Sequence, residues 1–298
     1  MRRDVSFVSK GQHCRGWLYL PDGIGESDKV PAIIMAHGFS GVKEQALPEV
    51  AERFAQAGFG VLLFDYRYFG SSDGEPRCQL FPLEMVEDYR NALTYASLDP
   101  NVDRARLAVW GTSFSGGLAT YTALVDRRVK AVVAQVPGIQ NADTRSSLNP
   151  ETWARVGKML IDDRDARYRT GVVNYLKVVA PEGEPCALPG AESYDAFMAL
   201  KEMAPTWRNE ITLESLEKIR EFDPLSLIHR LHPTPLLIIA AEHDTIIPLE
   251  LNKLAYEKAS EPKKLIVHPI KHFDVYQEPW LSTATDEAID WFNEHLKG

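Results

Sequence analysis

The stretch that decides the fold reads Leu107-Ala108-Val109-Trp110-Gly111-Thr112-Ser113-Phe114-Ser115-Gly116-Gly117. An apolar run typical of a buried strand leads into Gly-x-Ser-x-small and then into a sequence that predicts a helix. Such a strand-to-helix turn is tight and strained, and it lifts the hydroxyl of Ser113 above the sheet. Gly111 and Ser115 must be small because the turn brings its two backbone arms close together. The stretch therefore predicts a nucleophilic serine at residue 113.

A plainer interpretation of the same residues also exists. Ser115 stands where a second glycine is usual, and a serine at a helix N-terminus often only caps backbone amides. On the nucleophile hypothesis, replacing Ser115 by Ala should lower kcat only a little. A serine hydroxyl is a poor nucleophile without a base, and the base needs an orienting acid. The hypothesis therefore requires an acid and then a histidine, each after a later strand.

Two later strands supply these partners. The apolar strand predicted over residues 236–241 is followed by Asp244, and the loop after the next strand carries His272. Taken alone, Asp244 fits a carboxylate at a helix N-terminus, and His272 fits an ordinary surface histidine. Taken together, in the order serine, acid, histidine, they predict a triad of Ser113, His272 and Asp244.

Acyl transfer also needs two N–H donors for the oxyanion of the transition state. The residue after the nucleophile supplies one of them, which here is the backbone amide of Phe114. The second is expected from the loop after an early strand, where the chain reads Ala36-His37-Gly38-Phe39. We assign the backbone amide of Phe39 to this role. The plainer interpretation is a turn with a histidine packed beneath it.

Strand and helix patterns alternate along most of the chain. This alternation indicates βαβ crossovers and a parallel sheet with helices on both faces. Strands are predicted over residues 4–9, 15–20, 30–36, 60–64, 107–110, 129–136, 236–241 and 265–268, and helices over 47–57, 81–98, 114–125, 249–259 and 285–296.

One long segment interrupts the alternation. Residues 138–231 show no buried strand, and they carry helical patterns with Pro and Gly punctuation. We predict a core formed by residues 1–137 and 232–298, and a helical lid formed by 138–231. The lid leaves the sheet at its carboxyl edge, where ligands bind in such sheets, so we expect it to cover Ser113. Its aromatic residues either line an acyl pocket, with Phe197 and Trp207 as the candidates, or form the core of the lid; they are Trp153, Tyr168, Tyr175, Tyr194, Phe197 and Trp207.

Composition narrows the classes of partner. The 298 residues are 45% apolar and 25% charged, which is ordinary for a globular protein. Lys and Arg number 33 and Asp and Glu number 42, so the net charge is −9. An acidic chain repels phosphate backbones and anionic lipid, so we expect neither a nucleic-acid partner nor a membrane partner. No run approaches the roughly 20 apolar residues that cross a bilayer.

Cysteine usage and the N-terminus predict a cytoplasmic protein. Cys14, Cys78 and Cys186 are odd in number and far apart, which is typical of a reducing compartment. The basic start of the chain is not followed by the apolar core of a signal peptide. Two histidine pairs have metal-like spacing, but prolines follow or interrupt them, and no glycine-rich loop matches a nucleotide-binding pattern. We therefore expect no metal and no cofactor.

The motifs together resemble the α/β-hydrolase superfamily, and within it the dienelactone-hydrolase-like branch that includes fungal polyketide transferases and thiohydrolases. The resemblance covers almost the whole chain. It implies a mostly parallel eight-stranded sheet with a helical lid and a triad of Ser113, His272 and Asp244. The motifs that carry it are Ala36-His37-Gly38-Phe39, the segment from Asp65 to Gly74, the turn at Ser113, Glu242-His243-Asp244 and Lys271-His272-Phe273.

The function predicted from these features is serine-dependent cleavage of an ester or thioester through an acyl-enzyme on Ser113. The resemblance adds polyketide-type or other hydrophobic acyl groups as the substrate class. An acyltransferase, a perhydrolase and a catalytically silent binding protein of the same fold remain as alternatives. The partner is then a small acyl substrate, and a homodimer is left open.

Overall fold

The computed structural model describes residues 1–139 and 150–297. Its centre is an eight-stranded sheet. Strand β2 runs antiparallel to both of its neighbours, β1 and β4, and all other neighbouring strands are parallel. This confirms the predicted fold class. In spatial order the strands are β1 (Arg2–Ser9), β2 (Gln12–Tyr19), β4 (Gly60–Phe64), β3 (Val30–Ala36), β5 (Val102–Thr112), β6 (Val129–Gln135), β9 (Leu236–Ala241) and β10 (Lys263–His268).

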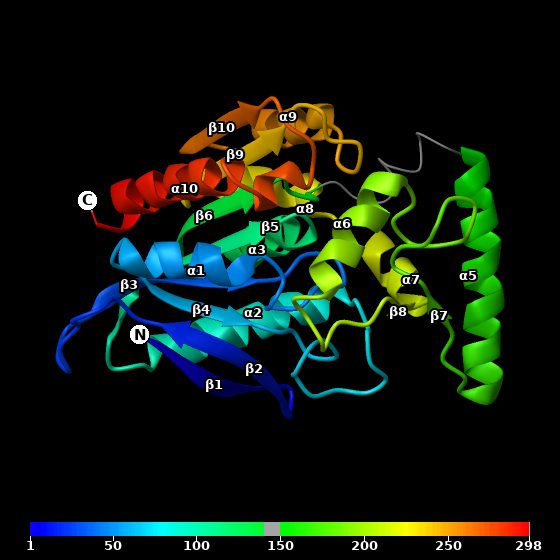
Figure 1. Ribbon diagram of the computed structural model, residues 1–298, viewed down its shortest axis with the longest axis horizontal. Coiled ribbons are helices and arrows are strands. Elements are labelled where there is room, and N and C mark those ends of the chain that lie inside the picture. Colours follow the sequence, from blue (N-terminus) through cyan, green and yellow to red (C-terminus); the bar gives the residue numbers. More distant parts are fainter. Residues whose placement is uncertain (140–149, 298) are drawn as a thin grey trace.

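Helices cover both faces of the sheet (Figure 1). Side chains alternate along a strand, so Ile33 and Met35 of β3 face one helical layer while Ile34 and Ala36 face the other. Burial on both sides explains why the central strands read as continuous apolar runs. One layer consists of α1 (Leu47–Gln56) and α10 (Trp280–Leu296), and the other of α2 (Pro82–Ser97), α3 (Phe114–Val125) and α9 (Leu249–Lys258).

A mostly helical segment lies between β6 and β9. We call its described part, residues 150–231, the inserted segment; residues 140–149 of the predicted 138–231 lie outside the described residues. The expectation of no buried strand is wrong at β8, which is buried and pairs with β7. The elements are α5 (Pro150–Thr170), β7 (Tyr175–Leu176), α6 (Ala191–Lys201), β8 (Ile211–Thr212), α7 (Glu214–Arg220), α8 (Pro224–Leu227) and the 3-10 helix η1 (Ile228–Arg230).

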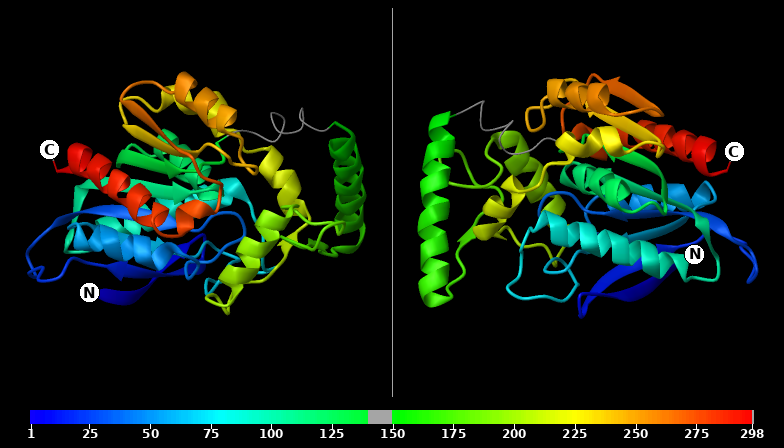
Figure 2. Two further views of the ribbon diagram at one scale, coloured as in Figure 1. Left: turned by 45° about the horizontal axis from the view of Figure 1, so that its top comes forward. Right: turned by 180° about the vertical axis from the view of Figure 1, so that it is seen from behind.

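The inserted segment stands at one end of the sheet, opposite the end where both chain termini lie (Figure 1). Both further views place α5 on its outer side, away from the sheet (Figure 2). Strand register aligns Ala36 with Gly111, and Thr112 with Gln135. The loops after β3, β5, β9 and β10 therefore meet at the carboxyl edge, which faces the inserted segment. Of the helices in the described part of the chain, none combines the length and apolarity that crossing a membrane requires.

Candidate active site

The turn between β5 and α3 has the strained geometry that the sequence predicts. Ser113 has φ 56° and ψ −126°, a conformation that a residue with a side chain rarely adopts. The Ser113 amide donates to the Gln135 carbonyl at 2.8 Å, which anchors the turn to β6. A side chain at Gly111 would overlap the backbone carbonyl of Ser115, so the small residue there is required.

Ser115 binds backbone groups in this turn, in line with the plainer interpretation of the sequence, and it also reaches β3. Its hydroxyl accepts from the Thr112 amide at 2.9 Å and donates to the Ala36 carbonyl at 2.8 Å. The side chain is fully buried and joins the turn to β3. Replacing it with Ala therefore removes buried hydrogen bonds and should cost about 1–3 kcal/mol of stability, while the small expected effect on kcat stays a prediction.

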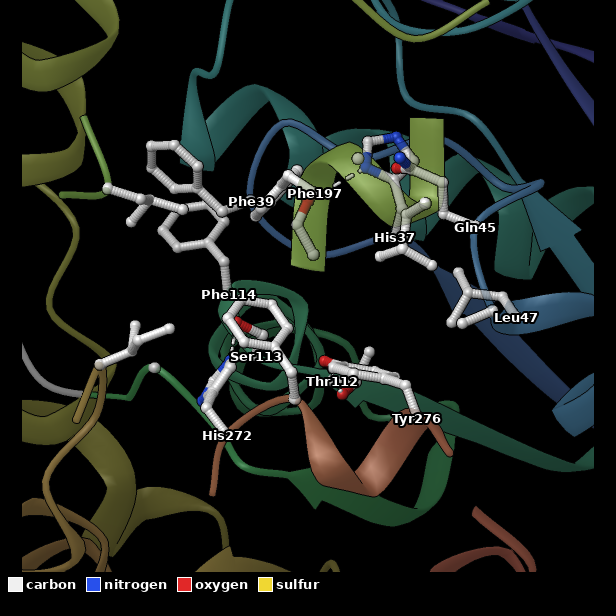
Figure 3. A pocket seen from close by; sticks show the side chains of 18 of the residues that line it. His37, Phe39, Gln45, Leu47, Thr112, Ser113, Phe114, Phe197, His272 and Tyr276 are labelled. Atoms are coloured by element: carbon white, nitrogen blue, oxygen red, sulfur yellow. Dashed lines mark hydrogen bonds between the residues drawn. The ribbon is translucent and has the colours of Figure 1, made fainter. Parts of the chain in front are cut away.

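The structure brings Ser113, His272 and Asp244 together at the carboxyl edge. His272 Nε2 lies 3.0 Å from Ser113 Oγ, and His272 Nδ1 lies 2.7 Å from Asp244 Oδ2. The side chains of Ser113 and His272 lie next to each other in Figure 3. Residues 113, 244 and 272 follow three different strands, so only the parallel sheet makes them neighbours.

The hydrogen-bond partners of Asp244 and His272 indicate which atom carries each proton. Asp244 Oδ1 accepts from the amides of Ile246 and Ile247 at 2.8 and 2.7 Å, which holds the carboxylate in one orientation. Asp244 Oδ2 then accepts from His272 Nδ1, so the ring proton of the neutral imidazole is on that nitrogen. His272 Nε2 is left as an acceptor that faces the hydroxyl of Ser113. This arrangement can remove the serine proton.

The loop that carries Phe39 lies against the turn that carries Ser113 and Phe114, and all three residues line one pocket. Neither the backbone amide of Phe39 nor that of Phe114 donates to a protein acceptor among the described residues. Gly38 brings the two loops close together, since a Cβ at Gly38 would lie 3.3 Å from Ser113 Cβ and 3.8 Å from the Phe114 nitrogen. The two phenylalanine rings pack edge to face at 5.9 Å. Two free N–H groups, when both point at one reacting carbonyl oxygen, can stabilise an oxyanion.

A largely apolar pocket opens above Ser113. Phe197 and Leu200 of α6 line it together with Leu188, so the inserted segment contributes part of the wall. The core supplies further apolar residues, among them Leu47 at the start of α1 and the loop residues Ile247 and Phe273. Such a lining favours the hydrocarbon part of a ligand over its polar part.

The structure places Trp207 outside this pocket. Its ring packs on Phe197 with centroids 5.6 Å apart, and its indole nitrogen donates to the Ser40 carbonyl at 2.9 Å. Trp207 instead borders a neighbouring polar cavity that Arg77 and Tyr68 also line. Of the other aromatic residues considered, Tyr168 is 93% exposed, Tyr175 and Tyr194 do not line the pocket, and the side chain of Trp153 lies outside the described residues.

Comparison with known proteins identifies the family. Residues 31–279 match the family described as alpha/beta hydrolase fold. The chain belongs to the α/β-hydrolase family. Two of its relatives are the thiohydrolase aneE of Aspergillus aculeatus, 32% identical over 88% of this hydrolase and 83% of that protein, and the polyketide transferase grgF of a Penicillium species, 31% identical over 99% and 97%.

Solved structures show the same relationship. DcsB, described in complex with its substrate analogue, superposes on this hydrolase with a TM-score of 0.87 at 31% identity over the whole of both chains. The α/β hydrolase GrgF of Penicillium superposes with a TM-score of 0.87 at 28% identity, again over both whole chains. The predicted resemblance to the branch with polyketide transferases and thiohydrolases is thereby confirmed.

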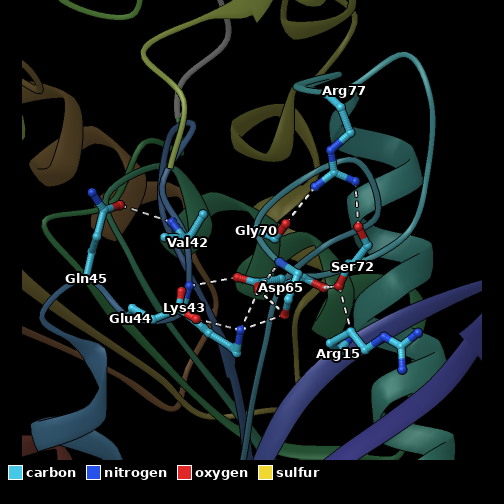
Figure 4. A network of polar contacts seen from close by, with 10 residues as sticks. Arg15, Val42, Lys43, Glu44, Gln45, Asp65, Gly70, Ser72 and Arg77 are labelled. Atoms are coloured by element: carbon cyan, nitrogen blue, oxygen red, sulfur yellow. Dashed lines mark hydrogen bonds and ion pairs between the residues drawn. The ribbon is translucent and has the colours of Figure 1, made fainter. Parts of the chain in front are cut away.

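A buried ion pair holds the loop of this hydrolase that carries Phe39. Asp65 is fully buried and accepts from the Lys43 ammonium and the Lys43 amide, both at 2.7 Å (Figure 4). Ser71 adds its amide at 3.0 Å and its hydroxyl at 3.1 Å. Burial opposes the charged form of Lys43, but the attraction of Asp65 outweighs it and raises the pKa of Lys43. Asp65 therefore has a structural role, as expected for the Asp65–Gly74 segment.

His37 in the same loop is buried and neutral. Its Nδ1 donates to the Gly38 carbonyl at 3.1 Å, because a carbonyl oxygen only accepts. The ring lies edge-on to Tyr66 and Phe69. Burial lowers the pKa of His37 to about 4, so the ring is uncharged at neutral pH. It packs beneath the turn, as the plainer interpretation of His37 and Gly38 proposes.

Sequence reasoning missed several pocket residues of this hydrolase. Tyr276 lines the pocket from the 3-10 helix η2 (Asp274–Tyr276), one helical turn after His272. That spacing was a signal that could have found it. Gln45 lines the pocket as well, but no spacing in the sequence distinguishes it from an ordinary loop residue.

Proposed function

We propose that this protein is a serine hydrolase that cleaves an ester or thioester of a hydrophobic, polyketide-type acyl group. The observation that carries the proposal is the chain of contacts from Asp244 through His272 to Ser113, with distances of 2.7 and 3.0 Å, at the base of an apolar pocket. The relatives named thiohydrolase and polyketide transferase support the choice of acyl group. Cysteine usage supports a cytoplasmic place of action.

In the proposed reaction Ser113 Oγ attacks the acyl carbonyl carbon while His272 Nε2 takes the serine proton. Asp244 stabilises the imidazolium that forms. The carbonyl oxygen becomes an oxyanion that accepts from the amides of Phe39 and Phe114. The intermediate then breaks its bond to the alcohol or thiol, which leaves with the proton from His272. Water repeats the sequence and releases the acid.

We propose further that residues 138–231 act as a lid over a core of residues 1–137 and 232–298. Support comes from Leu188, Phe197 and Leu200, which lie in the pocket wall. The segment is also tied to the core, since Trp207 donates to Ser40 and the Thr212 amide donates to the Cys78 carbonyl at 3.0 Å. A covered site excludes water and favours transfer to a bound acceptor. Acyl transfer is therefore the second candidate.

A fluorophosphonate probe tests the proposal directly. The wild-type protein should be labelled and should turn over p-nitrophenyl esters or acyl thioesters. Ser113→Ala should lose the label and lower kcat by a factor on the order of 10⁴–10⁶, because binding and oxyanion donors remain while covalent catalysis is lost.

Ser115→Ala is the matched control, and it should keep the label while losing stability. A labelled Ser113→Ala protein alongside an unlabelled Ser115→Ala protein would assign the nucleophile to Ser115 instead. A wild-type protein with neither label nor turnover would favour the silent binding protein. Turnover that rises sharply with added hydrogen peroxide would favour the perhydrolase, and turnover that needs an alcohol or amine acceptor would favour the transferase.

A further inference from the structure

A chain of hydrogen bonds below Ser113 leaves one proton without a protein acceptor. Gln135 Nε2 lies 3.2 Å from Thr112 Oγ1 and can only donate to it. The hydroxyl of Tyr276 lies 2.7 Å from the same oxygen. Thr112 is buried, and its hydroxyl proton has no other acceptor among the described residues. Because Thr112 Oγ1 already accepts from Gln135, the Thr112 hydroxyl donates to Tyr276, and the hydrogen bonds run from Gln135 to Thr112 to Tyr276.

In that arrangement the hydroxyl of Tyr276 accepts from Thr112, so its own proton is free. Tyr276 lines the pocket that contains Ser113. Burial raises the pKa of Tyr276, so the hydroxyl remains a donor across the neutral range. A buried donor without a partner is unfavourable, and an oxygen atom of a bound ligand supplies the missing acceptor.

Gln45 supplies a second donor in the same condition. Its Oε1 accepts from the Val42 amide at 3.0 Å, which fixes the orientation of the side-chain amide. The amide nitrogen Nε2 is therefore the free end, and it is buried without a partner among the described residues. Gln45 is 7% exposed and lines the pocket.

The two donors occupy one side of the pocket. Figure 3 shows Gln45 and Tyr276 on the same side, with Leu47 between them, while Phe39 and Phe114 gather on the other. The pocket thus has an aromatic side that suits hydrocarbon. On its other side one N–H donor and one O–H donor lack acceptors. A plain alkyl chain would leave both donors unpaired, whereas a chain with keto oxygens would pair them.

We propose that Tyr276 and Gln45 form a subsite that selects acyl chains carrying keto oxygens over unsubstituted alkyl chains. This rests on the proposed function, because it concerns the acyl group delivered to Ser113. A keto oxygen only accepts, which matches two donors and needs no acceptor from the protein. Sites built to hydrogen-bond a ligand group discriminate against analogues that lack it, because the buried donors are then left unpaired.

The test compares thioesters of N-acetylcysteamine with octanoic, 3-oxooctanoic and 5-oxooctanoic acids. Wild-type kcat/KM should favour at least one oxo substrate over octanoyl by about tenfold or more. Tyr276→Phe should lower that preference about tenfold, because it deletes one donor and keeps the ring. Gln45→Glu should lower it similarly, because Oε1 still accepts from Val42 while the donor is replaced by an acceptor.

Tyr19→Phe is the control, since it deletes a tyrosine hydroxyl on β2 outside the pocket, and it should keep the wild-type preference. Thermal melts establish that each variant is folded, and Gln45→Glu carries the test alone if Tyr276→Phe is not. The subsite is refuted if wild type has no preference for oxo substrates, or if the folded variants lower all substrates by one factor. A protein that no fluorophosphonate labels and that cleaves no thioester would refute the proposed function instead.

Discussion

The candidate site is assembled from two regions that use ion pairs differently. In the loops after β3 and β4, Lys43 and Asp65 are almost fully buried and the carboxylate accepts four hydrogen bonds. In the inserted segment, α5 carries ion pairs that lie in solvent, such as Lys158 with Asp162, whose side chains are 77% and 63% exposed. Removing one partner of a buried ion pair lowers the free energy of unfolding by roughly several kcal/mol, whereas an exposed ion pair contributes little to it.

This difference matches what each region has to do. The buried pair fixes the loop that presents the Phe39 amide, where small displacements cost catalysis. The inserted segment supplies Phe197 and Leu200 to the wall, and its outer helix α5 leaves Ile161 and Tyr168 largely exposed. The comparison predicts strong stability effects in the loops and effects on substrate choice in the inserted segment.

Removing the buried ammonium tests the first half of the comparison most strongly. Lys43→Met should lower the free energy of unfolding by about 3–5 kcal/mol, because Asp65 is left buried and unpaired. Urea denaturation measures the loss. Adding Asp65→Asn should recover part of it, since the uncompensated charge is gone. A loss below about 1 kcal/mol would place this pair in the exposed class.

The protonation of His37 gives the loops a pH dependence. The pKa of His37 falls from 6.5 to about 4 on folding, so the unfolded chain binds the proton first as pH drops. Stability is therefore fully present above about pH 6.5 and is lost toward pH 4, by about 3 kcal/mol in all. Urea midpoints of wild type and His37→Asn between pH 7 and pH 4.5 measure it. Parallel curves for the two proteins would contradict the assignment.

Two neighbouring aromatic residues test whether the inserted segment chooses the substrate. Phe197→Ala should change kcat/KM unevenly across acyl chain lengths, by about 10–100-fold for the most affected chain, because Phe197 lines the pocket. Trp207→Ala should lower kcat/KM for all acyl chain lengths by a common factor, because Trp207 packs behind Phe197. A panel of p-nitrophenyl esters from acetyl to decanoyl separates the two. If both variants lowered kcat/KM equally for all chain lengths, the prediction that the inserted segment selects the substrate would be wrong.

The smallest effect is expected from the ion pairs of α5. Lys158→Met should lower the free energy of unfolding by at most about 1 kcal/mol, and less at high salt, because the side chains of Lys158 and its partner Asp162 are 77% and 63% exposed. Denaturation at low and high salt measures both. A loss as large as that of Lys43→Met would erase the difference between the two regions.

Much of the fold and site could be predicted because local pattern and chain order carry them. Continuous apolar runs gave β3, β4 and β9 with their observed bounds, since strands buried on both faces leave no polar positions. The turn at Ser113 was predictable because few residues tolerate it. The pairing of β7 with β8 was not, because two-residue strands have no periodicity.

The sequence by itself determined the family and the order in which the serine, the acid and the histidine follow successive strands. It also determined the identity of the residues that follow β5, β9 and β10. Each of these follows from residues close together in the chain, where sterics and hydrogen bonding act locally. Only the tertiary structure decided that Trp207 stands behind Phe197, that Ser115 joins the turn to β3, and that Gln45 and Tyr276 share one side of the pocket. Those relations depend on how segments far apart in the chain pack against each other, and residue type and spacing do not specify such packing.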